Sequence, residues 1–179
     1  MPNWVEGNIR FRGKVKDILE LLKNELEFVG VDRDFPFDDD RRTVTFKPIV
    51  HTIDWGDLAI ECPEYDKELV LRTCYIKGTR RNFLDAKTII FPTIQDITDL
   101  EDEDKAFVLF DCFQAAWGVD PDPYVELSKK YNVDIRINAW EKGMEFYVNL
   151  VIEGGEVTRF EEIKYDDWYW ESEMPQLGG

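Results

Sequence analysis

Nine residues near the middle of the chain, DITDLEDED at 96 to 104, contain six acidic side chains and no basic one. Clustered carboxylates could hold a divalent cation, imitate the phosphates of a nucleic acid, or keep a loop in water. A calcium loop needs acids at positions 1, 3 and 5, a glycine at 6 and a glutamate at 12. Counted from Asp99, position 6 is Asp104 and position 12 is Phe110. The spacing therefore does not predict a dedicated metal site.

Other residues that could do chemistry are few. The single histidine, His51, has Asp54 nearby as an orienting partner, but the two serines, Ser128 and Ser172, fall in an expected helix and in the tail. The sequence therefore does not indicate a catalytic pair of a nucleophile and a histidine base. Asp111 interrupts an apolar strand, and could be a carboxylate of perturbed pKa or a residue at which the strand leaves the core. We expect no catalytic residue, no bound metal and no cofactor.

A second acidic segment, EEIKYDDWYWESE at 161 to 173, has six acids, one lysine and four aromatic residues. It could be a final strand whose aromatic rings cover the core and whose acids are solvated. It could also be an interface, since clustered Trp and Tyr are typical of protein-binding hot spots. Residues 96–104 contribute −6 and residues 161–173 contribute −5, so together they carry −11 of the formal net charge of −16. Solubility alone would not require that concentration.

Such a divided acidic surface could compete with a nucleic acid for a groove lined by Lys and Arg. We expect the contacts to come from both acidic segments and from two tryptophans. The candidate contact residues are Asp99, Glu101, Asp102, Glu103, Asp104, Glu161, Glu162, Asp166, Asp167, Trp168 and Trp170.

The overall composition limits the class of protein. With 179 residues, 44% of them apolar, the chain is long enough for one domain with a core. Its net charge of −16 argues against direct binding to nucleic acid or to an anionic membrane. The three cysteines, Cys62, Cys74 and Cys112, form no CxxC pair and predict neither a zinc site nor a disulfide framework. The amino terminus lacks an apolar leader and no long apolar run follows, so we expect a cytoplasmic protein.

The elements that would position these residues are clearest at the two ends of the chain. GNIRFRG alternates as a half-buried strand, with Ile9 and Phe11 on one face and Arg10 and Arg12 on the other. Residues 15–28 follow with helical spacing, and residues 27–104 are expected to be an irregular insertion with one or two edge strands. AFVLFDCF, residues 106–113, is apolar on both faces and predicts a central strand that is covered on both sides.

After that strand, Pro121 or Pro123 in a first turn and Asn132 at the end predict a second helix. VDIRINAW alternates as a strand, and Gly154 and Gly155 predict a tight hairpin turn after it. The order β, α, insertion, β, α, β, β, β indicates an α+β fold. We expect a single ferredoxin-like domain over residues 1–179: a plait of split βαβ units with an extended antiparallel sheet, a C-terminal hairpin and an acidic aromatic tail at about 161–179.

Three motifs carry a resemblance to a known family. MPNW at residues 1–4, AWGVDPDP at 116–123 and GMEF at 143–146 resemble the YubB-type ferredoxin-like domain proteins of phages and plasmids. Val5 replaces the Cys that is common in the family, and the Trp-Gly-Thr-Lys-like segment is present only as KGTRRNF. The resemblance implies the plait and a mobile-element origin. It supplies no catalytic residues.

These features lead to a ranked set of expectations about function. The first is a non-enzymatic phage or mobile-element protein, an acidic nucleic-acid mimic that inhibits a CRISPR effector or restriction enzyme of the host. A small metal-dependent or nucleotide-acting enzyme that uses Asp111 and the acidic loop is the alternative from another class. A structural or regulatory phage module that forms a homodimer through an exposed edge strand is the third.

Overall fold

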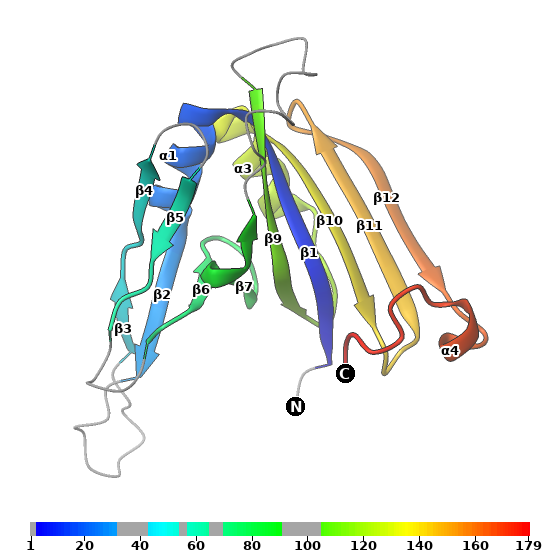
Figure 1. The fold of residues 1–179 in the computed structure, drawn as a ribbon. Coiled ribbons are helices and arrows are strands. Elements are labelled where there is room, and N and C mark those ends of the chain that lie inside the picture. The colour runs from blue at the N-terminus through cyan, green and yellow to red at the C-terminus, as the bar shows by residue number, and fades with distance from the viewer. Residues whose placement is uncertain (1–2, 32–42, 54–56, 65–69, 91–104) are drawn as a thin grey trace.

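A large antiparallel sheet with few helices forms the fold (Figure 1). The computed structural model describes residues 3–31, 43–53, 57–64, 70–90 and 105–179. In chain order the elements are β1 (Trp4–Lys14), α1 (Val15–Glu25), β2 (Leu26–Val31), β3 (Thr43–Phe46), β4 (Ile49–Ile53), β5 (Asp57–Glu61), β6 (Thr73–Ile76), β7 (Asn82–Asp85), the short 3-10 helix η2 (Ala86–Thr88), β8 (Ile89–Ile90), β9 (Lys105–Ala116), α3 (Asp122–Tyr131), β10 (Asp134–Glu141), β11 (Phe146–Glu153), β12 (Glu156–Lys164) and α4 (Trp168–Glu171).

The described strands form a ten-stranded open sheet and a separate two-stranded one. The order in the large sheet is β12-β11-β10-β1-β9-β7-β6-β2-β3, and β8 pairs with β9 beside this path. The small sheet pairs β4 with β5. β1 therefore lies between β10 and β9, in the middle of the half of the sheet that carries the longest strands (Figure 1).

β1 is central because its residues alternate as a strand requires. Val5, Ile9 and Phe11 are fully buried, whereas Arg10 and Arg12 are exposed on the opposite face. Gly7 permits a close approach of the neighbouring strand, since a Cβ at that position would lie 2.0 Å from the backbone oxygen of Asn138. The register between β1 and β9 also shifts between Gly7 and Ile9, which marks a β-bulge beside this glycine.

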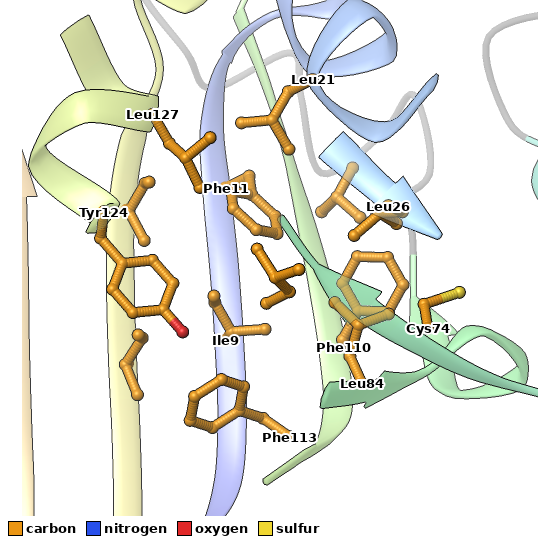
Figure 2. Close-up of a cluster of buried hydrophobic side chains, with 14 of the residues drawn as sticks. Ile9, Phe11, Leu21, Leu26, Cys74, Leu84, Phe110, Phe113, Tyr124 and Leu127 are labelled. Carbon is orange, nitrogen blue, oxygen red and sulfur yellow. The ribbon is translucent and has the colours of Figure 1, made fainter. Parts of the chain in front are cut away.

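Helices α1 and α3 cover one face of the sheet and complete the core. Figure 2 shows Phe11 of β1 and Phe110 of β9 in one cluster with Leu21 of α1 and Leu127 of α3. Phe11 and Phe110 pack edge to face, with ring centroids 6.3 Å apart. Tyr124 of α3 is buried in the same cluster. The core is therefore built from strands and helices that are far apart in the sequence.

The helix ends follow local signals in part. α3 begins with Pro in its first turn and ends at Asn132, which has left-handed dihedrals of φ 52 and ψ 47, as its sequence predicts. α1 ends at Glu25, earlier than the helical spacing suggests, because Leu26 turns to extended dihedrals and starts β2 with no intervening loop. Leu26 remains buried, now on a strand.

The C-terminal hairpin is confirmed. β10, β11 and β12 pair in sequence as antiparallel neighbours. The turn between β11 and β12 is made by Gly154 and Gly155, whose φ values of 59 and 79 lie in the left-handed region that glycine adopts without strain.

The mixed α and β class with a large antiparallel sheet agrees with the sequence prediction, but the plait is not confirmed. The three strands β10-β1-β9 have the order and directions that a plait requires. β2, which a plait would place beside β9, is separated from it by β6 and β7. The range 27–104 accordingly holds regular strands, β3 to β8, in addition to most of β2, where one or two edge strands were expected.

The prediction that β9 is covered on both faces is wrong. Val108 and Phe110 are fully buried, but on the other face Phe107 is 37% exposed and Leu109 is only partly buried. The helices α1 and α3 lie on one side, so the face that carries Arg10, Arg12 and Phe107 has no helix of the described residues against it. We call it the open face. The apolar run of β9 is thus not a two-sided core strand.

Candidate interaction surface

The most exposed acidic part of the described chain is the hairpin strand β12 with the turn and helix that follow it. We call residues 156–173 the carboxyl-terminal surface. Every residue of β12 is exposed, and β12 is an edge of the large sheet. Residues 156–173 contain seven acids and two bases. The acids are Glu156, Glu161, Glu162, Asp166, Asp167, Glu171 and Glu173.

Some of these acids stabilise the structure locally. Asp167 is the N-cap of α4, and its side chain accepts a hydrogen bond from the backbone N–H of Trp170 at 3.3 Å. The Glu171 carboxylate accepts from the N–H groups of Asp166 and Asp167, at 3.0 and 3.3 Å. Asp167 and Glu171 therefore hold α4 in place, which leaves them less free to meet a partner.

The remaining predicted acids are available to solvent. Glu161 is exposed, although its carboxylate accepts a hydrogen bond from Asn149 at 3.3 Å. The side chains of Glu162 and Asp166 are exposed and make no hydrogen bond or ion pair within the described part of the chain. Their charges therefore project into water without a counter-ion among the residues that the structure describes.

The two predicted tryptophans have opposite environments. Trp168 is only 2% exposed; its indole N–H donates to the Pro175 carbonyl at 2.9 Å and its ring packs edge to face on Tyr165. Trp170 is 87% exposed and Tyr169 is 71% exposed. Trp168 anchors the tail to the fold, whereas the rings of Trp170 and Tyr169 are exposed to solvent.

The residues after α4 return to the start of β1 (Figure 1). The N–H of Gly178 donates to the Glu6 carboxylate at 3.1 Å, and the N–H of Gly179 donates to the Trp4 carbonyl at 3.2 Å. Glu6 also accepts a bond from Gln114 of β9 at 2.8 Å. These bonds tie the tail to the central strands, so α4 is held from both sides.

The environment of Tyr165 raises the pKa of its side chain. Burial raises the pKa of its phenol, and the nearby carboxylate of Glu173 raises it further. The carboxyl-terminal surface thus combines exposed aromatic rings with a local negative potential, which is a composition suited to a basic partner surface.

Part of the predicted acidic surface lies outside the described residues. Asp99, Glu101, Asp102, Glu103 and Asp104 all fall in the range 91–104. Asp54, the proposed orienting residue of His51, also lies outside the described residues, in the range 54–56. His51 itself belongs to β4, where its backbone pairs with Ala59.

The candidate catalytic acid, Asp111, is exposed and not buried in a central strand. It lies where β9 shifts register against β1, beside the exposed Cys112. The strand does not leave the core at that point, because Phe110 and Phe113 on either side of Asp111 and Cys112 are both fully buried. Cys62, Cys74 and Cys112 are free thiols. Within the described ranges, no three His, Cys, Asp or Glu side chains gather closely enough to hold a metal ion.

The sequence reasoning missed two features that the structure brings out. One is Tyr169, an exposed ring beside Trp170, with the ammonium of Lys142 5.4 Å from its centroid. The other is a group of arginines on the open face, in which Arg10 of β1 pairs directly with Arg136 of β10. Alternation already placed Arg10 outward, but only the register between strands could reveal its neighbour.

The comparisons with known proteins gave no relative. No protein-family model, no curated protein and no solved structure matches this chain. In the described residues, no helix has the length and apolar character needed to cross a membrane.

Proposed function

We propose that this chain is a non-enzymatic binding protein whose carboxyl-terminal surface occupies the basic nucleic-acid-binding groove of a partner protein. The observation that carries the proposal is the exposed strand β12, with Trp170 and Tyr169 exposed next to it, in a segment with seven acids against two bases. Exposed aromatic rings supply binding energy, and the carboxylates supply attraction to Lys and Arg.

Glu161 and Glu162 are consecutive on β12, and successive side chains in a strand point to opposite faces of the sheet. β12 therefore presents a carboxylate on each of its two faces, and Asp166 adds another at the turn. The support for mimicry of a nucleic acid is the density of exposed carboxylates at this edge of the sheet, and not a one-sided row with the spacing of phosphates.

The partner class follows from charge and from the family resemblance. A protein with a net charge of −16 is attracted to basic surfaces, and nucleic-acid enzymes carry the strongest of them. The resemblance to phage and plasmid proteins favours a host defence protein, of the CRISPR effector or restriction type, as the partner. Inhibition would then arise because this chain and the nucleic acid compete for the same groove of the partner.

The proposal is tested by charge reversal. The variant Glu161→Lys, Glu162→Lys, Asp166→Lys leaves the α4 cap intact, since Asp167 and Glu171 are unchanged. We expect capture of basic nucleic-acid-binding proteins from lysate by the native chain at about 50 mM salt, release of these proteins as the salt rises, and no capture by the variant.

A matched control separates the surface from the net charge. Glu20→Lys, Glu64→Lys, Glu126→Lys changes the same number of exposed acids at sites away from β12. This control should still capture the partner, with affinity lowered only slightly. Equal loss of capture in both variants would mean that the protein binds through its overall charge and not through the carboxyl-terminal surface.

The exposed edge of β12 also raises the possibility of a homodimer. Two copies paired through β12 would bring two segments of net charge −5 together, and like charges across a strand pair are destabilising. Electrostatics therefore favours a basic partner over a second copy. Light scattering across a dilution series tests this, because a β12 dimer would dissociate as the concentration falls.

We also propose that the core is a ferredoxin-like plait into which a hairpin has been inserted. β10-β1-β9 supply three of its four strands, and β6 with β7 would be the hairpin that separates β9 from β2. The helices α1 and α3 on one face of the sheet agree with this arrangement. An experimental structure would test it by the position of β2.

A further inference from the structure

The open face carries a pocket over the middle strands of the large sheet, which extends to β11, the neighbour of β12. It has a volume of about 250 Å³ and lies over β1, β10 and β11. Three arginines line it, Arg10, Arg12 and Arg136, together with Asp134 and Glu153. In a chain with 38 acids and 22 bases, a concave site with more bases than acids is unusual.

One of the three arginines is already neutralised. The Arg12 guanidinium lies 2.7 Å from the Asp134 carboxylate and 2.9 Å from that of Glu153. These hydrogen bonds raise the Arg12 pKa, Asp134 having the largest effect. Arg12, Asp134 and Glu153 thus form a closed ionic group along one side of the pocket.

The other two arginines, Arg10 and Arg136, have no such partners in the described part of the chain. Arg10 and Arg136 face each other directly across the β1–β10 pair, and both are exposed. Neither makes an ion pair or a side-chain hydrogen bond with any residue that the structure describes. Like charges directly opposite on neighbouring strands are destabilising. An anion between the two guanidinium groups would remove that repulsion and satisfy their planar donors.

The pocket also has an apolar side. Phe107 of β9 is 37% exposed and pairs with Arg12, and Val151 of β11 pairs with Arg136. A ring of this size left open to solvent can pack against a flat apolar group of a ligand. The lining therefore combines two free donors for an anion with a surface for an aromatic or heterocyclic group.

We propose that this pocket binds a small organic phosphate monoester with a planar ring, the chemistry of a nucleoside monophosphate. Arg10 and Arg136 hold the phosphate between them, and Phe107 contacts the ring. The closed group around Arg12 limits the charge of the ligand, because Asp134 and Glu153 would repel a second and third phosphate. The volume of about 250 Å³ suits a small ligand and not a polymer.

The test is a calorimetric titration of the full chain with adenosine 5′-monophosphate. We expect saturable binding, with affinity lowered at least about tenfold in Arg10→Gln and in Arg136→Gln, since each removes a charged hydrogen-bond donor. Arg80→Gln is the matched control: it removes an exposed arginine between β6 and β7 that does not line the pocket, and should leave the affinity unchanged. Phe107→Ala should weaken the nucleotide but not inorganic phosphate.

Several results would overturn the proposal. They are an absence of saturable binding of adenosine 5′-monophosphate, an equal loss of affinity in Arg80→Gln, or undiminished binding in Arg10→Gln. Adenosine binding as tightly as its monophosphate would do the same, because the arginines would then have no part in recognition. Thermal unfolding of each variant shows that it is folded, and removing one of two opposed like charges should not lower its melting temperature. None of these outcomes bears on the carboxyl-terminal surface, so this inference and the proposed function fail separately.

Discussion

At the scale of single residues, the two tryptophans of α4 show how position and not residue type decides a role. Trp168 and Trp170 are two residues apart, yet one is 2% and the other 87% exposed. The sequence could not separate them, because α4 is a single turn and the burial of Trp168 depends on Pro175 returning over it. A one-turn helix has too few residues to show a periodic pattern.

We predict that Trp168→Ala lowers the free energy of unfolding by about 3 kcal/mol, because it removes a buried ring and its hydrogen bond to Pro175. Trp170→Ala should change stability by less than about 0.5 kcal/mol, since the ring is exposed. It should instead weaken partner capture. Urea unfolding of both variants measures the difference, and equal stability would contradict the anchoring role of Trp168.

At the scale of elements, α1 and α3 are joined by a buried carboxylate. Glu25, the last residue of α1, accepts hydrogen bonds from Lys130 at 2.6 Å and from the Tyr131 hydroxyl at 2.5 Å. Burial raises the Glu25 pKa, but these bonds to the charged form outweigh it and leave the pKa below its ordinary value. The contact is between the ends of two helices that cover the same core.

This contact predicts a pH dependence of stability. Because the folded-state pKa of Glu25 is depressed, its contribution is complete above the unfolded pKa of about 4.3 and is lost as the pH falls through the lower folded value. Glu25→Gln should be less stable than the native chain by about 1 kcal/mol at pH 7. The difference should shrink below pH 4. A difference that stays constant with pH would show that the charge of Glu25 does not matter.

Elements with local signals were predictable, and those with long-range partners were not. α3 has Pro in its first turn and Asn132 at its end, and the β11–β12 turn has two glycines, so neighbouring residues define them. The insertion of β6 and β7 between β9 and β2 depends on pairing across tens of residues. For the same reason the facing pair of Arg10 and Arg136 could not be read from alternation alone.

At the scale of the whole molecule, charges of opposite sign occupy separate places. The carboxyl-terminal surface is acidic and lies at one edge of the sheet, whereas the arginine pocket lies over its middle strands. Within the described residues, neither Arg10 nor Arg136 forms an ion pair with an acid of the carboxyl-terminal surface. A single chain can therefore offer one surface to cations and one pocket to anions.

The two halves of the large sheet, on either side of the junction between β9 and β7, are also expected to unfold as separate units. β1 pairs with β9 along nearly the whole of both strands, whereas the other edge of β9 pairs with β7 through Asn82, Phe83 and Leu84 and with β8 through Ile89 and Ile90. A seam of such short pairings is where a sheet opens first. In amide hydrogen exchange we expect β1, β9, β10 and β11 to be protected longest, and β2, β6 and β7 to exchange together at a lower opening free energy. The arginine pocket would then persist through openings that expose the other half of the core.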